Sequence, residues 1–168
     1  MRISELLLPE YDNEIAVTRV VLERVPYDRV EWKPHPKSFP MGHLAQLVAR
    51  LPGWANMVLD HTELDIAPKD GPKYPGYSFE KTATLLAEFD TGAASGRASI
   101  AKTSDDDFQV PWSLKRAGTT MLTMPRYLAL RSTVLNHLVH HRAQLGVYLR
   151  LVDVPVPQMY GPTADEGK

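Results

Sequence analysis

The sequence predicts an all-α fold, a four-helix bundle with a short β-hairpin before its last helix. Four stretches place apolar residues at helical spacing, at about residues 4–25, 40–61, 78–103 and 124–152. Four amphipathic helices with a long second connection are typical of such bundles. We expect a single domain over residues 1–168, with a core at about 4–152 and an extended C-terminal tail at 153–168.

The composition excludes several classes of protein and site. The net charge of −1 gives no electrostatic basis for binding nucleic acid or an anionic membrane, so neither is an expected partner. The absence of cysteine excludes disulfides, thiolate nucleophiles and cysteine-held zinc, and leaves His, Asp or Glu to bind any metal. No apolar run approaches about 18 residues and residues 1–9 lack a signal-peptide pattern, so we expect a cytoplasmic protein.

The first predicted helix carries one apolar stripe. The members of this stripe follow helical spacing and are Leu7, Tyr11, Ile15, Thr18, Leu22 and Val25. The acidic residues Glu10, Glu14 and Glu23 are expected largely on other faces. We predict Ser4 as the N-cap, and Pro26 ends the helix.

Proline shapes the next two segments. Four prolines within residues 26–40 exclude a helix there and favour an extended or turn conformation, from which Trp32 packs onto the bundle. The second helix, at about 40–61, is expected to have Ser38 as its cap and Pro40 in its first turn. Pro52 inside this helix should kink it or remove one hydrogen bond.

The middle of the chain combines loops with a third helix. Residues 62–77 are dense in turn-forming residues and are expected to form a long loop. Ser78 is the predicted cap of the third helix, in which Gly92 and Gly96 weaken the helix or permit close helix approach. The three consecutive aspartates at 105–107 predict a solvated loop, and the pattern at 109–123 predicts a hairpin over a polar turn.

The histidines of the fourth helix are the strongest sign of chemistry. His137 and His141 are four residues apart, so on a helix they lie about 40° apart around the axis, one turn above the other. Two imidazoles at that spacing can bind one metal ion. Both lie on or beside the apolar face, where a buried imidazole needs a partner. A divalent metal is one such partner, and ordinary hydrogen bonds are the alternative.

His43 is the candidate for a third ligand. It lies on the apolar face near the start of the second helix, and it joins the pair if that start lies beside the fourth helix. Three histidines leave an open coordination position, as in catalytic zinc sites. Zinc, nickel, iron and manganese all suit these ligands, so we expect one divalent ion per chain without assigning the element. We expect His35 in an exposed loop and His61 at a helix end or on the surface.

Several motifs occur in a fixed order along nearly the whole chain. They are His43-Leu, the block Asn136-His137-Leu-Val-His140-His141-Arg142-Ala-Gln144-Leu, Tyr148-Leu-Arg150 and Val156-Pro157-Gln-Met-Tyr160-Gly161-Pro162. In this order they resemble the DinB family, also called the DinB/YfiT-like metalloenzymes. The resemblance implies a four-helix bundle, often dimeric, with a divalent metal on three histidines. These fall on His43, His137 and His141. Ala143 departs from the pattern, because the family often has glycine after the arginine.

Three polar residues flank the candidate ligands. We interpret His140 as a neighbour of the ligands, while the resemblance favours His141 as the ligand itself. Arg142 and Gln144 are expected on the surface or between helices. Near a metal, either side chain could orient a ligand histidine or a substrate carboxylate.

Three hypotheses for the function follow. The superfamily that the chain resembles includes thiol-dependent S-transferases, which implies a metal-dependent transferase or a related hydrolase acting with a low-molecular-weight thiol or another small molecule. The second hypothesis is a non-catalytic metal-binding or stress-response protein with a structural ion. In the third, the histidines are polar core residues without metal. We also expect a homodimer that buries apolar residues such as Trp54, Leu85 and Val147.

Overall fold

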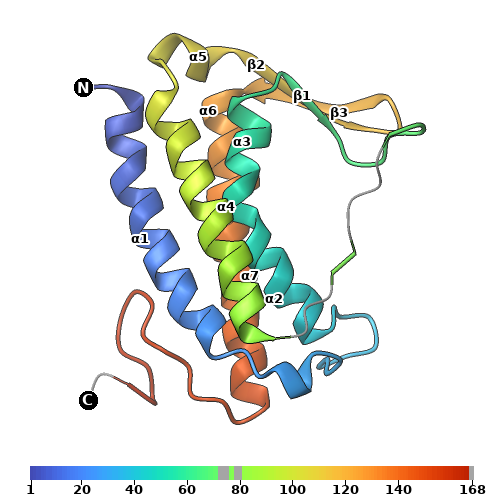
Figure 1. Ribbon diagram of the computed structural model, residues 1–168, viewed down its shortest axis with the longest axis vertical. Coiled ribbons are helices and arrows are strands. Elements are labelled where there is room, and N and C mark those ends of the chain that lie inside the picture. Colours follow the sequence, from blue (N-terminus) through green and yellow to red (C-terminus); the bar gives the residue numbers. More distant parts are fainter. Residues whose placement is uncertain (72–75, 78–80, 167–168) are drawn as a thin grey trace.

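The computed structural model describes residues 1–71, 76–77 and 81–166. These residues are mostly helical, with a small three-stranded sheet at one end of the helices (Figure 1). No helix within these ranges is long and apolar enough to cross a membrane.

The helices are α1 (Ile3–Glu23), α2 (Met41–Arg50), α3 (Trp54–Leu59), α4 (Thr82–Lys102), α5 (Asp105–Gln109), α6 (Arg126–Ala129) and α7 (Asn136–Leu151). The strands are β1 (Glu63–Asp65), β2 (Pro111–Arg116) and β3 (Thr119–Pro125), and short turns of helix are η1 (Tyr27–Arg29), η2 (Leu51–Gly53) and η3 (Leu130–Leu135).

The start of α1 is closed by a capping box, with Arg2 as the N-cap. The Arg2 backbone N–H donates to Glu5 Oε2 (2.9 Å), and the Glu5 backbone N–H donates back to the Arg2 carbonyl oxygen (3.1 Å). Ser4 is fully buried inside the first turn, so its prediction as the cap is wrong. The Glu5 carboxylate thus satisfies the backbone N–H of the N-cap residue, while the Arg2 side chain has no acceptor and makes no capping hydrogen bond.

Proline divides the second predicted helix into α2 and α3. The break is the 3-10 turn η2, which contains Pro52. Proline has no backbone N–H and its ring crowds the preceding turn, so the interruption falls where the sequence predicted it. Pro40 is the N-cap of α2 and does not lie in its first turn, and the cap predicted at Ser38 is therefore wrong.

Four helices pack against one another around a shared core. α1 contacts α4 and α7, and α2 contacts the same two helices. Gly96 allows α4 to approach η2 closely, because a Cβ there would lie 2.4 Å from the Pro52 carbonyl oxygen, whereas a Cβ on Gly92 would lie at an ordinary contact distance of 3.4 Å from the Gly53 nitrogen. Close helix approach, one of the two roles predicted for these glycines, is thus confirmed for Gly96. Trp32 packs on this core from the connector, also as predicted.

The apolar residues expected at a dimer interface differ in exposure. Leu85 is fully buried in the core, so its prediction as a surface residue is wrong. Trp54 is half-buried and Val147 is 59% exposed. Of the three residues, Trp54 and Val147 therefore remain accessible to a second chain, and the homodimer stays a prediction.

The predicted hairpin forms from β2 and β3, and it gains a third strand within the stretch 62–77 that was predicted as a loop. β1 pairs parallel to β2, with Glu63 opposite Ser113. The hairpin turn holds Ala117 and Gly118 at positive φ angles of 51° and 81°. Asp65 accepts hydrogen bonds from both of their backbone N–H groups, at 3.0 and 2.7 Å. One carboxylate thus holds the end of β1 against the turn.

The three consecutive aspartates begin a helix, so their prediction as a solvated loop is wrong. They form the first turn of α5, and the Ser104 hydroxyl caps it by accepting from the Asp107 backbone N–H (3.1 Å). Carboxylates are favourable in the first turn because they complement the positive end of the helix dipole. Asp105 also accepts from the Ile3 backbone N–H (2.8 Å), which joins α5 to the start of α1.

The last two predicted helices differ from expectation at their starts. α4 begins at Thr82, and the cap predicted at Ser78 lies outside the described residues. The fourth predicted helix is divided into α6, the π-helical segment η3 and α7. A π segment shifts the helical register and is frequent at functional sites. Here it ends just before His137.

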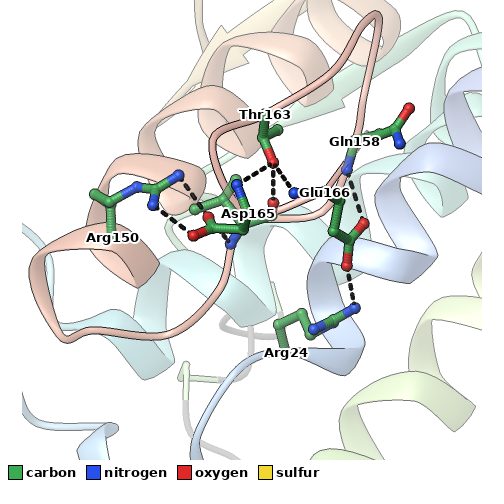
Figure 2. Close-up of polar contacts among 7 residues, drawn as sticks. Arg24, Arg150, Gln158, Thr163, Asp165 and Glu166 are labelled. Atoms are coloured by element: carbon green, nitrogen blue, oxygen red, sulfur yellow. Dashed lines mark hydrogen bonds and ion pairs between the residues drawn. The ribbon is translucent and has the colours of Figure 1, made fainter. Parts of the chain in front are cut away.

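The C-terminal tail folds back on itself and is not extended as predicted (Figure 2). The Thr163 hydroxyl donates to the Val156 carbonyl oxygen (2.8 Å) and accepts from the Asp165 backbone N–H (3.2 Å). The Val156 N–H, followed by the Arg150 guanidinium, holds the pKa of the Asp165 carboxyl below its usual value. Two ion pairs join this loop to the ends of α7 and α1, Arg150–Asp165 (2.6 Å) and Arg24–Glu166 (2.6 Å).

Candidate metal centre

His137 and His141 lie in contact on α7, as their spacing predicted. Their Nε2 atoms are 2.8 Å apart and their ring centroids are 4.6 Å apart. Both side chains are half-buried, and Trp54 of α3 packs edge-on against His137 at a centroid distance of 5.7 Å. The two imidazoles therefore direct the same ring nitrogen toward one point.

The outer nitrogens of the two rings determine where the hydrogens lie. His137 Nδ1 is 3.3 Å from the backbone carbonyl oxygen of Thr133, and His141 Nδ1 is 2.8 Å from Oε1 of Gln144. Both oxygens are acceptors, so each Nδ1 carries a hydrogen and donates it. In a neutral ring the facing Nε2 then carries a lone pair. With both rings in this tautomer, the two lone pairs 2.8 Å apart repel each other unless a cation, either a proton or a metal ion, lies between them.

Burial favours the neutral form of both rings. It is the main cause that lowers the pKa of His137, followed by the charge of His141. It also lowers the pKa of His141, where the hydrogen bond to Gln144 acts in the opposite direction. A shared proton is therefore disfavoured at neutral pH, whereas a neutral imidazole is the form that binds a metal ion.

His43 lies on α2 with its ring stacked between two aromatic side chains. The ring centroids of Phe39 and Tyr77 are 4.2 and 4.0 Å away, at interplanar angles of 9° and 16°. Burial, followed by the charge of His141, lowers the pKa of His43. No three His, Cys, Asp or Glu side chains are arranged to hold one ion in the part of the chain that the structure describes. The structure thus brings two of the predicted ligands into contact and places the third on a helix packed against theirs.

The remaining histidines lie outside this pair. His35 is exposed in a loop, as predicted, and its Nδ1 accepts from the Lys37 backbone N–H (3.1 Å). His61 is exposed directly after α3, in agreement with its expected surface position. His140 is exposed with its ring 4.8 Å from that of His141, which fits a neighbour of the ligands.

A buried ion pair lies one residue along the chain from His141. Arg142 is 1% exposed, and its Nη2 is 2.7 Å from Glu14 Oε2. The same guanidinium donates to the Thr18 hydroxyl (3.0 Å) and to the hydroxyl of Tyr160 in the tail. The Tyr160 hydroxyl donates in turn to Glu14 Oε2 (2.7 Å). This network joins α1, α7 and the tail.

The sequence contains a signal for this ion pair that the predicted apolar stripes did not include. Arg142 occupies a core position in a helical stripe of buried residues, Leu138, Arg142, Leu145 and Leu149. Glu14 lies at helical spacing between the buried Tyr11 and Thr18 and is 7% exposed, so its expected place off the apolar stripe is wrong. Opposite charges on the buried stripes of two helices indicate pairing, because unpaired buried charges are rare. Arg142 is accordingly interhelical, one of its two expected places.

Comparison with known proteins shows the fold. No protein-family model and no curated protein matches the chain. A DinB-like protein from Bacillus cereus ATCC 10987 is similar at 19% identity and a TM-score of 0.69, over 95% of this chain and 98% of that one. The DinB-like protein YjoA from Bacillus subtilis is similar at 15% identity and a TM-score of 0.65, over 92% of this chain and 99% of that one. The chain therefore has the fold of the DinB-like proteins, as the motif resemblance implied.

Proposed function

We propose that this chain is a DinB-like protein that binds one divalent metal ion through His137, His141 and His43. The observation that carries the proposal is the 2.8 Å contact between two Nε2 atoms whose rings both donate their Nδ1 hydrogens to other acceptors. Metal-binding histidines are usually oriented by such an outer hydrogen bond. Burial favours the neutral form of both rings, and the neutral imidazole is the form that binds a metal ion.

His43 completes the ligand set if its ring moves toward the pair. Its helix packs against α7, and its ring would have to leave the stack between Phe39 and Tyr77 to reach an ion at the pair. Losing an aromatic contact costs about 0.5–1.5 kcal/mol for each pair. Structural zinc binds with an apparent free energy of about 10–16 kcal/mol, which exceeds that cost several-fold.

In this proposal the protein is a metal-dependent enzyme, a transferase using a low-molecular-weight thiol or a hydrolase. Three protein ligands leave one coordination position open, and an ion held in this way supplies Lewis acidity to the group that enters it. The chain has no cysteine, so a reacting thiol must come from a small molecule. The contacts of α1 and α2 with both α4 and α7 support describing the helices as a four-helix bundle, in which metal sites form between facing helices.

Cobalt substitution tests both the site and its open position. The visible spectrum of the Co²⁺ protein is expected to change on addition of mercaptoethanol or azide, because a small donor enters the open position. A His35→Ala variant should give the same spectra as the wild type, since His35 is exposed and distant in sequence from the pair. A spectrum that ignores both additions would indicate a closed structural ion, as in the non-catalytic alternative. A protein that acquires no cobalt absorption at all would contradict the site.

A further inference from the structure

An apolar cavity of about 350 Å³ opens beside the histidine pair. It lies between α3, the small sheet and η3, and His137 forms part of its wall. Trp54 of α3 and Trp112 of β2 line it together with Leu114. Its volume falls at the lower end of the range of about 300–1,000 Å³ that is typical of small-molecule sites.

The walls of this cavity offer no charge and few polar partners. None of the described residues that line it is Asp, Glu, Lys or Arg. The Ser132 and Thr133 hydroxyls donate their hydrogens to helix carbonyl oxygens, at 2.8 and 2.5 Å. The Trp112 indole N–H donates to the Met57 carbonyl oxygen (3.0 Å). An ionised group in the cavity would therefore lose its water without gaining a partner, at a cost of several kcal/mol.

Aromatic side chains give the cavity a preference among uncharged groups. Two indoles line it, and offset or edge contacts between aromatic rings add about 0.5–1.5 kcal/mol beyond the burial of area. Trp54 also contacts His137, so a ring packed on this indole lies next to the histidine pair. An aromatic group that carries a metal-binding atom at one end could thus place that atom toward the proposed ion.

We infer that this cavity binds the uncharged aromatic part of a small-molecule substrate, with the reacting end of the substrate at His137. The assignment of the reacting end rests on the proposed metal-dependent function. The binding of the aromatic part rests on the cavity alone and does not require the ion.

The test uses N-phenyl-1-naphthylamine, an uncharged aromatic probe whose fluorescence rises in an apolar site. Its sulfonated relative, 8-anilinonaphthalene-1-sulfonate, has the same ring skeleton with one negative charge. The metal-free full-length protein should bind the uncharged probe at one site and at least about tenfold more tightly than the sulfonate, because the cavity offers the charge no partner.

A cavity-filling variant locates the bound probe. Leu114→Trp adds ring atoms inside the cavity and should weaken probe binding at least about tenfold. Leu128→Trp makes the same change on α6 at a position that is 49% exposed and does not line the cavity, so it should bind like the wild type. Leu64→Trp, at another lining position, repeats the test if Leu114→Trp fails to fold. Zinc affinity should be unchanged in all three variants.

The outcomes separate the two proposals. Loss of probe binding in Leu114→Trp alone, with zinc binding retained, supports the cavity assignment. Probe binding without zinc binding also supports the cavity while contradicting the metal site. Equal binding of the probe by Leu114→Trp and Leu128→Trp, or tighter binding of the sulfonate, would overturn the cavity assignment whatever the zinc result.

Discussion

Replacing Arg142 by methionine is expected to lower the free energy of unfolding by about 3–5 kcal/mol, the usual cost of breaking a buried ion pair. Methionine keeps the aliphatic bulk but leaves the Glu14 carboxylate 7% exposed and without its cationic partner. The Tyr160 hydroxyl remains as a donor to that carboxylate but carries no charge. Typical domains have a total stability of about 5–15 kcal/mol, so this loss is a large fraction of it. Urea unfolding followed by circular dichroism measures it.

A matched arginine on the same helix provides the control. Arg150→Met removes an exposed pair with Asp165, which should cost about 0–1 kcal/mol because water already screens it. The double variant Arg142→Met with Glu14→Leu should recover much of the loss, since neither buried charge remains. If Arg142→Met cost no more than Arg150→Met, the network would not stabilise the fold as described.

Replacing His141 by alanine is expected to weaken zinc binding by more than about 100-fold. Losing only the outer hydrogen-bond partner of a ligand histidine costs about 10–100-fold, so losing the ligand itself costs more. The change leaves His137 Nε2 without the second nitrogen that lies 2.8 Å from it. Calorimetric titration of the metal-free variant and the wild type at one pH measures the difference.

Neighbouring variants test whether the loss is specific to the pair. His140→Ala is the closest control, because its side chain is exposed on the same helix, and it should keep wild-type affinity. Gln144→Ala should lose about tenfold, because it removes the acceptor that orients the His141 ring. Equal losses in His140→Ala and His141→Ala would show that the ligand has been assigned to the wrong histidine.

The sequence predicted those parts of the fold that depend on local periodicity. Each long helix appears as an apolar stripe, and Pro52 marks the break between α2 and α3 because its effect is local. The three-residue strand β1 has no such pattern, since it exists only through pairing with β2 about fifty residues away. The cap of α1 was assigned to Ser4 because serine is a frequent cap, but the reciprocal bonds of Arg2 and Glu5 take that role.

The candidate site was likewise predictable only where it depends on local spacing along one helix. His137 and His141 meet because their spacing on one helix sets their distance, so sequence alone was sufficient. The position of His43 depends on how α2 packs against α7, and its stack with Tyr77, which lies far along the chain, has no sequence signature. The buried pair Arg142–Glu14 was missed because charged residues are usually assigned to the surface, even where they occupy a core stripe.

The metal content of the wild-type chain tests the central proposal most directly. The protein is purified without a nickel column, reconstituted with zinc, manganese or nickel in separate samples, freed of unbound ion and analysed by mass spectrometry of the elements. The proposed site predicts close to one divalent ion per chain in at least one sample, and much less in His141→Ala. A negligible content in every wild-type sample would contradict metal binding at the His137–His141 pair.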